Sequence, residues 1–435
     1  MSNLRPFQII TLAVFVALAI VSILLLSGFS PSGSEDDATY GDRVVIWGVL
    51  EARVFNEAID EIGNSDEAFE VVSYRQIDSR SFDDILVNAI AEGNSPDLVL
   101  LPGSKLVHNR SKLSAFSSET ISEGDFSNTY IDGAEIFARP DGVYALPLAV
   151  DPIVMYWNKD MFANNGLAQA PSTWESVVST VAPALIQTDN NRNLQQSALA
   201  FGEVRNVQNA KEILLLLALQ SGSKMVYEQN GQYVIELNKS RSGNGLPPLE
   251  ASAQFFTNFS NANNQLYSWN RSQPLDKNMF VAGNLGLYFG FGSELDSIVS
   301  KNPNLSFDMA AVPQGASATI RRTYGEFYGF AIPKASQNKQ GALLVAKKFT
   351  SSDVSAYISE LFKMAPASRN AVAAGSSDTY RQIILNSALI ARGWLDPGSA
   401  QTDKVFQDMI ENVSSGRMQL NAAVRDAELK LQLIF

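Results

Sequence analysis

The sequence contains no cysteine and a single histidine, His108, among 435 residues. Zinc sites with cysteine ligands, iron–sulfur clusters, thiol catalysis and disulfide bonds are therefore excluded, and so are metal sites built from several histidines. A triad of serine, histidine and aspartate would have to use His108, which stands in a polar stretch and is interpreted as a surface residue. A chain of this length can bury a large core without covalent cross-links.

Positive charge is also in short supply, because 33 lysine and arginine residues face 45 acidic residues, which gives a net charge of −12. Contacts to nucleic-acid phosphates need an excess of lysine and arginine, so the balance argues against nucleic acid as a partner of the whole chain. It also mildly disfavours an anionic ligand, although local fields matter more than net charge. We expect no cofactor and no metal ion.

Only one long uncharged apolar run is present, at residues 9–26. A helix of this length, at ~1.5 Å per residue, nearly spans the ~30 Å hydrocarbon core of a membrane. Arg5 before the run and acidic residues after it favour an N-terminus inside the cell and an extracytoplasmic body. The predicted segments are a cytoplasmic stub, a transmembrane anchor or signal, and a flexible linker, at residues 1–8, 9–29 and 30–41.

A cleaved secretory signal is the alternative to an anchor. The apolar run is longer than a usual signal core, and no clear small-residue cleavage site follows it. Leu26, Ser27 and Gly28 resemble a bacterial lipoprotein box, but Phe29 stands where such a box has the cysteine that receives the lipid. The sequence therefore favours a transmembrane helix in place of a lipid anchor.

The body begins with apolar segments whose patterns alternate between strand and helix. Strands are expected at residues 43–47, 69–74 and 96–101, with amphipathic helices between them at 52–62 and 81–92. This succession is typical of a parallel sheet covered by helices. Further strands are expected at residues 143–147, 153–157, 198–201, 284–289, 307–312 and 329–332. Further helices are expected at 158–165, 210–220, 249–259, 341–349, 354–363, 379–391, 402–413 and 422–433.

Five segments of the body carry a family resemblance. They are RPDGVYALPLAVDPIVMYWNKDMF at residues 139–162 with PSTWE at 171–175, SPDLVL at 95–100, YGEFYGFAIP at 324–333, the P-x-x-R element at 366–369, and the segment at 416–424. In this order they resemble the extracellular solute-binding proteins of ABC importers, family 1, the maltose-binding-protein-like group. The resemblance covers residues 42–435.

The resemblance implies an α/β fold, namely the two-lobed periplasmic-binding-protein type II fold with a hinge and an interlobe cleft. Lobe 1 would comprise residues 42–150 and 318–368, and lobe 2 residues 151–317 and 369–435. The implied function is capture of a small polar solute, with a sugar favoured, by a monomeric, membrane-tethered body that serves ABC permease subunits without catalysis. Hinge closure over a solute and ligand binding beyond strand ends fit this interpretation.

Two alternatives remain open. A receptor that signals or adheres would have the same sequence features, and only neighbouring permease genes would separate the two. A glycoside-acting enzyme would need two carboxylates flanking the bond, and no local motif marks such a pair among the acidic residues.

Nine residues are candidates for contacts with the ligand: Glu51, Ser104, Asp151, Glu203, Phe291, Tyr324, Glu326, Phe327 and Trp394. The resemblance implies a ligand-binding carboxylate at Asp151 and polar groups in the loops after early strands. Aromatic rings can stack on a sugar, and Gly325 and Gly329 would let a ligand approach the backbone. Core packing remains the alternative for the aromatic residues. Arg321 and Arg322 are interpreted as a solvated pair.

Overall fold

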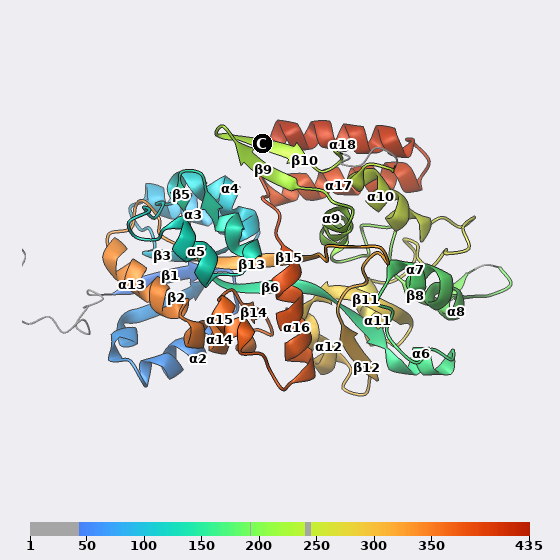
Figure 1. The fold of residues 1–435 in the computed structure, drawn as a ribbon, viewed down its shortest axis with the longest axis horizontal. Helices are drawn as coiled ribbons and strands as arrows, with labels where there is room; N and C mark the ends of the chain where they lie inside the picture. Colours follow the sequence, from blue (N-terminus) through green and yellow to red (C-terminus); the bar gives the residue numbers. More distant parts are fainter. Residues whose placement is uncertain (1–42, 192, 240–244) are drawn as a thin grey trace, which may run out of the picture. The chain divides into compact units, whose positions relative to one another are not determined.

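An eleven-stranded sheet runs through the residues that the computed structural model describes, which are 43–191, 193–239 and 245–435 (Figure 1). Its strands are β1 (Val44–Gly48), β2 (Val72–Gln76), β3 (Leu98–Pro102), β6 (Leu146–Asn158), β7 (Gln187–Thr188), β8 (Leu194–Leu199), β11 (Leu285–Phe291), β12 (Phe307–Ala310), β13 (Thr323–Ala331), β14 (Ala365–Pro366) and β15 (Ala391–Arg392). The strand order is β2-β1-β3-β13-β6-β11-β8-β7, with β12 and β14 attached to β6 and β15 to β13.

The first three strands form the parallel sheet that the sequence predicts, because β1 pairs in parallel with both β2 and β3. All five residues of β3 are buried, as expected of a strand covered on both faces. Helix α2 (Ala52–Gly63) buries the predicted apolar stripe, including Phe55 and Ile59. The predicted strand at 69–74 begins later, because residues up to Val71 form the short 3-10 helix η1 (Glu67–Val71).

Strand β6 is longer than predicted. The sequence interpretation placed two strands, at 143–147 and 153–157, on either side of a gap, and the structure joins the end of the first and all of the second into thirteen continuous residues. Pro147 and Pro152 lie inside this strand and lack the N–H group that a sheet ladder normally uses. Twelve of its thirteen residues are buried, so packing on both faces outweighs the missing donors.

The sheet changes partners in the middle of β6. Residues before Ile153 pair antiparallel with β13 and, at Ala149 and Val150, with β14. Residues from Ile153 onward pair antiparallel with β11, and those from Met155 with β12. The sheet therefore has two halves that share β6, and the change falls at Asp151 and Pro152. Because β6 and β13 run antiparallel to their neighbours, the sheet as a whole is mixed and not purely parallel.

Helices cover the sheet, and their bounds are as follows. The longer ones are α3 (Phe82–Ala91), α9 (Ala210–Gln220), α10 (Pro248–Asn258), α13 (Lys339–Phe349), α14 (Ser352–Leu361), α16 (Thr379–Ile390), α17 (Ser399–Ser414) and α18 (Leu420–Ile434). The shorter α-helices are α4 (Leu106–Asn109), α5 (Glu123–Thr129), α6 (Lys159–Asn164), α7 (Trp174–Ser176), α8 (Ala182–Leu185), α11 (Asp276–Val281), α12 (Leu295–Lys301) and α15 (Arg369–Ala373).

Short helical turns and two small hairpins complete the described chain. The 3-10 turns are η2 (Gly103–Lys105), η3 (Arg110–Lys112), η4 (Asp132–Phe137) and η6 (Gly292–Glu294), and η5 (Val177–Val181) is a π-helical turn. The hairpins are β4 (Ala138–Arg139) with β5 (Gly142–Val143), and β9 (Met225–Gln229) with β10 (Gln232–Glu236).

The C-terminal part of the chain returns to the N-terminal half. Figure 1 shows α13 and α14 in the half of the molecule that holds β1 and β2, and α13 contacts β1 while α14 contacts α2. Phe349 at the end of α13 packs on Phe330 of β13 and Phe55 of α2, with ring centroids 5.2 Å and 5.5 Å apart. Buried aromatic pairs of this kind stabilise the fold beyond the contribution of their buried surface area. Here they join three separate segments of the chain.

None of the helices within the described ranges is long and apolar enough to cross a membrane. The predicted stub, anchor or signal and linker at residues 1–41 lie outside those ranges.

Candidate functional site

Two carboxylates lie opposite each other on the neighbouring strands β6 and β13. Asp151 of β6 and Glu326 of β13 are register partners, and partners in neighbouring strands project from the same face of a sheet. Asp151 Oδ1 accepts a hydrogen bond from the backbone N–H of Ser293 at 3.1 Å. Glu326 Oε1 accepts one from the backbone N–H of Ser104 at 3.2 Å.

These two hydrogen bonds connect β6 and β13 to turns in both halves of the sheet. Ser104 lies in η2, directly after β3 of the first half, and Ser293 lies in η6, directly after β11 of the second half. Both turns stand at the carboxyl end of a strand, where ligands of open α/β sheets bind. A change in the relative position of the two halves would therefore change the hydrogen bonds of this carboxylate pair.

Burial raises the pKa of the Asp151 carboxyl to about 7, opposed by the hydrogen bonds from Ser293. Burial likewise raises the pKa of the Glu326 carboxyl to about 7, opposed by the hydrogen bonds from Ser104. A carboxyl group with a pKa near neutrality exists partly as the acid, so it can donate a hydrogen bond as well as accept several. The pair can thus match the hydroxyl groups of an uncharged polar molecule, which both donate and accept.

Aromatic rings accompany the pair. Phe291 ends β11 and meets Tyr324 of β13 edge to face, with ring centroids 6.3 Å apart. Tyr324 is buried, whereas Phe291 is half-buried. Five of the nine candidates are therefore joined by hydrogen bonds, ring contacts or strand register: Ser104, Asp151, Phe291, Tyr324 and Glu326.

The other four candidates lie in separate surroundings. Glu51 is exposed after β1 and pairs with Arg53 at 3.3 Å. Glu203 is buried and pairs with Arg271 at 3.2 Å. The ring of Phe327 faces η4, on the side of β13 away from the carboxylates. Trp394 is 1% exposed between the rings of Phe406 and Phe435. Whether any of the nine binds a ligand stays a prediction.

Sequence reasoning missed two charged residues at the start of α9. The charge of Glu212 raises the pKa of Glu326 and that of Lys211 lowers it, so both lie near the carboxylate pair. Lys211 Nζ pairs with the buried Asp396 at 3.1 Å. The signal was present in the sequence, because these are the only charged residues of an otherwise apolar helix, AKEILLLLALQ.

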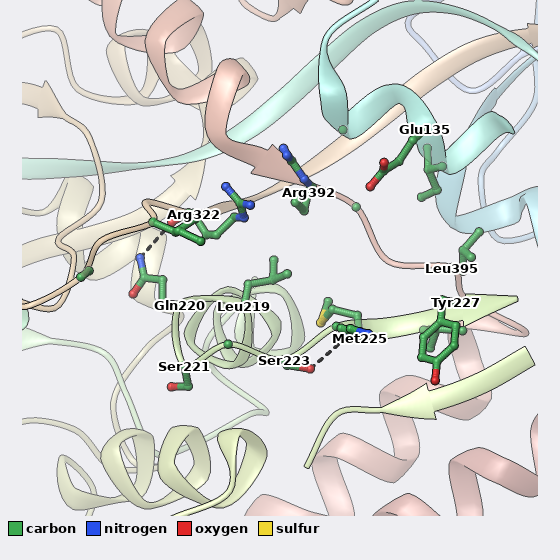
Figure 2. A pocket seen from close by; sticks show the side chains of 18 of the residues that line it. Glu135, Leu219, Gln220, Ser221, Ser223, Met225, Tyr227, Arg322, Arg392 and Leu395 are labelled. Atoms are coloured by element: carbon green, nitrogen blue, oxygen red, sulfur yellow. Dashed lines mark hydrogen bonds between the residues drawn. The ribbon is translucent and has the colours of Figure 1, made fainter. Parts of the chain in front are cut away.

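A separate cavity of about 840 Å³ opens between η4 and the region where α9 ends and β9 begins. Figure 2 shows its labelled side chains, among them Glu135 on one side, Gln220 and Ser223 on the other, and Arg322 and Arg392 along the wall near β15. None of the nine candidates is among its lining residues. Such a volume is typical of sites for small molecules, ~300–1,000 Å³.

The structure corrects the interpretation of Arg321 and Arg322 as a solvated pair. Arg321 is exposed, but Arg322 is half-buried and lines the cavity. The backbone of Arg322 is held by Gln314 and Gln220, whose side-chain amides both donate to its carbonyl at 3.0 Å. Only one arginine of the pair is therefore free to remain in solvent.

No group of three or more histidine, aspartate or glutamate side chains is arranged to hold a metal ion within the described ranges. Polar groups lie at strand ends where the two halves of the sheet meet. Residues 58–383 match the profile of a family described as bacterial extracellular solute-binding protein, and the chain belongs to that family.

Curated relatives agree with this assignment. A protein of Brucella abortus strain 2308, which carries a provisional name as a binding protein, is 21% identical over 357 residues, covering 80% of this chain and 82% of its own length. A similarly named protein of Brucella suis biovar 1 strain 1330 gives the same values.

Solved structures share the fold. A cyclo/maltodextrin-binding protein complexed with maltotetraose matches with a TM-score of 0.72 and 14% identity, covering 93% of this chain and 98% of that one. An ABC transporter solute-binding protein from Thermotoga lettingae TMO, bound with alpha-D-tagatose, matches with a TM-score of 0.67 and 19% identity, covering 91% and 100%. At these identities the likeness establishes the fold alone, which is the α/β solute-binding fold that the sequence predicts.

Proposed function

We propose that this protein captures a small polar solute, a carbohydrate, in a cleft between two lobes and presents it to an ABC permease. The observation that supports this most directly is the carboxylate pair Asp151 and Glu326, each bonded to a turn in a different half of the sheet. The proposed lobes are residues 42–150 with 318–368, and residues 151–317 with 369–435. A solute that bridges the turns would favour the closed arrangement of the lobes.

The chemistry of the pair favours a sugar. Carboxyl oxygens accept from hydroxyl groups, and the half-buried ring of Phe291, which contacts the buried ring of Tyr324, is the proposed stacking surface for a sugar. Structural neighbours with this fold hold maltotetraose and alpha-D-tagatose. The same nine candidate residues serve as the proposed contacts, with the five that lie together given priority.

The location proposed for this body is outside the cytoplasmic membrane, tethered by the apolar run at residues 9–29 with the N-terminus inside. The mass of the mature protein tests the tether. An intact chain supports an anchor, whereas a chain trimmed near residue 30 shows that the run is a signal peptide.

The function is tested by titrating the full-length protein, purified in a mild detergent, with sugars, polyols, peptides and polyamines. A solute that binds only the folded state raises the melting temperature by mass action. We expect sugars to give the shift and Asp151→Ala to abolish it. The matched control is Asp160→Ala, which removes an exposed carboxylate from α6. A panel without any stabilising solute, or a sugar that is cleaved, contradicts the proposal.

A further inference from the structure

The cavity described above has a charge opposite to that of the whole chain. The chain has a net charge of −12, yet the cavity is lined by four cationic side chains and two acidic ones. The cations are Arg139, Lys224, Arg322 and Arg392, and the acids are Glu123 and Glu135. Both acids are exposed, while the three arginines are half-buried. A partly enclosed cleft with an excess of charge of one sign concentrates ligands of the other sign.

Arg322 is held in place by its backbone and is not neutralised by a carboxylate. Its N–H donates to Gln314 Oε1 at 3.0 Å, and its carbonyl receives the two amide hydrogen bonds from Gln314 and Gln220. Within the described ranges its guanidinium has one recorded hydrogen bond, to the carbonyl of Arg321 at 3.0 Å, and no ion pair. Most of its donors therefore remain open to a ligand.

Arg392 is carried next to Arg322 by strand pairing, because Ala391 of β15 is the register partner of Thr323, the residue after Arg322. Figure 2 shows both guanidinium groups on the same part of the cavity wall. Burial, and after it the nearby charge of Arg392, lower the pKa of Arg322, while the charges of Asp132 and Glu135 oppose this shift. Arg392 pairs at 3.2 Å with Asp132, a carboxylate that also forms an ion pair with Arg369.

A third arginine adds an unused donor. Arg139 donates from one terminal nitrogen to the carbonyl of Glu135 at 2.7 Å. Its Nε is buried and has no hydrogen-bond partner within the residues that the structure describes. Guanidinium groups remain charged in proteins, so the wall keeps its positive charge without a bound partner. Leaving a buried donor without a partner is unfavourable, and a ligand oxygen that reached this nitrogen would satisfy it.

We infer that this cavity is a second binding site, for a small molecule that carries a carboxylate or phosphate group, with Arg322 and Arg392 as its anion-recognition residues. A guanidinium presents a planar fork of donors that matches two oxygens of either anion. The small residues Gly222 and Ser223 at the end of α9 leave room for the rest of the molecule. Neither Asp151 nor Glu326 lines this cavity.

Isothermal titration calorimetry of the full-length protein in detergent tests the inference, with inorganic phosphate, D-glucuronate and glucose as probes at constant ionic strength. We expect phosphate or glucuronate to bind and glucose not to bind at this cavity. The phosphate and glucuronate arms show which of the two anions is preferred. Arg322→Gln should weaken binding of the anion by tenfold or more.

The matched control is Arg321→Gln, which removes the same charge one residue away on an exposed side chain. It should leave binding unchanged. Arg322→Lys keeps the charge but loses the fork, and we expect an intermediate loss of affinity. Circular dichroism and an unchanged melting temperature establish that each variant is folded. The inference is overturned if neither anion binds, or if the two glutamine variants bind the anion equally.

Discussion

At the scale of single residues, the raised pKa of Asp151 gives a definite pH dependence. Its ordinary value is 3.8 and its value in the folded protein is about 7. Between these pH values the folded state holds more protons than the unfolded state, so the free energy of unfolding falls as pH rises. Asp151→Asn removes this slope. At about 1.4 kcal/mol per pKa unit, the free energy of unfolding of the variant, measured relative to the wild type, should be about 1–4 kcal/mol higher at pH 8 than at pH 4.

Urea unfolding of the wild type and Asp151→Asn at pH 4, 6 and 8 measures this difference. The asparagine keeps an oxygen that can accept the N–H of Ser293. Asp160→Asn, at an exposed position, serves as the control and should show no comparable change. An identical pH profile in the wild type and Asp151→Asn would show that the Asp151 carboxyl titrates in its ordinary range.

Residue-level reasoning from sequence depends on recognisable strand ends and on the family resemblance, and it cannot see burial. Ser104 was selected because it follows an apolar strand, Asp151 because the resemblance implies a carboxylate there, and Glu326 because it precedes a strand with two glycines. The structure connects the three through hydrogen bonds and strand register, and a ligand role for them stays a prediction. Arg321 and Arg322 are chemically identical neighbours, and only tertiary packing distinguishes the exposed one from the one that lines a cavity. No local pattern carries that distinction.

At the scale of elements, η4 packs so closely on β13 that a side chain at Gly133 would not fit. A Cβ atom there would lie 2.2 Å from Cζ of Phe327 and 2.5 Å from the carbonyl oxygen of Ala391. Gly133→Ala should therefore cost about 1–3 kcal/mol of unfolding free energy, as overpacking does. Gly124→Ala in α5 is the control, since its nearest neighbour is Ser122 Oγ at 3.8 Å. Chemical denaturation of both variants measures the contrast, and equal stabilities would refute the close packing.

The elements themselves were predicted unevenly. The helix predicted at 210–220 coincides with α9. The hairpin of β9 and β10 was missed, although Asn230 and Gly231 between them have positive φ angles of 53° and 77°. Asparagine followed by glycine is the strongest short hairpin signal, and it would have located this element. Strand β6 was predicted as parts of two separate strands, and it contains Pro147 and Pro152, which lack the N–H group of a sheet ladder.

At the scale of the whole molecule, Arg110 makes one of several contacts between the two proposed lobes, beside those of Asp132 with Arg369 and Arg392. Arg110 of η3 belongs to the first, and the hairpin β9–β10 belongs to the second. The guanidinium of Arg110 donates to Glu228 Oε2 at 2.9 Å and to the hydroxyl of Tyr233 at 3.0 Å. The Glu228 side chain is 5% exposed, so this ion pair is screened little by water. Hinge opening would break it, whereas closure restores it.

Glu228→Gln should therefore shift the protein toward an open arrangement even without solute. A charge-assisted hydrogen bond contributes about 1.5 kcal/mol or more, so the open-to-closed ratio should rise by about tenfold. Because the chain has no cysteine, Asp60→Cys on α2 and Asp160→Cys on α6 can each take one dye for single-molecule energy transfer. The control is Asp141→Asn, since Asp141 pairs with the same arginine from within the first lobe. If the distance distribution of Glu228→Gln equals that of the control, the ion pair does not couple the lobes, and closure must depend on the solute alone.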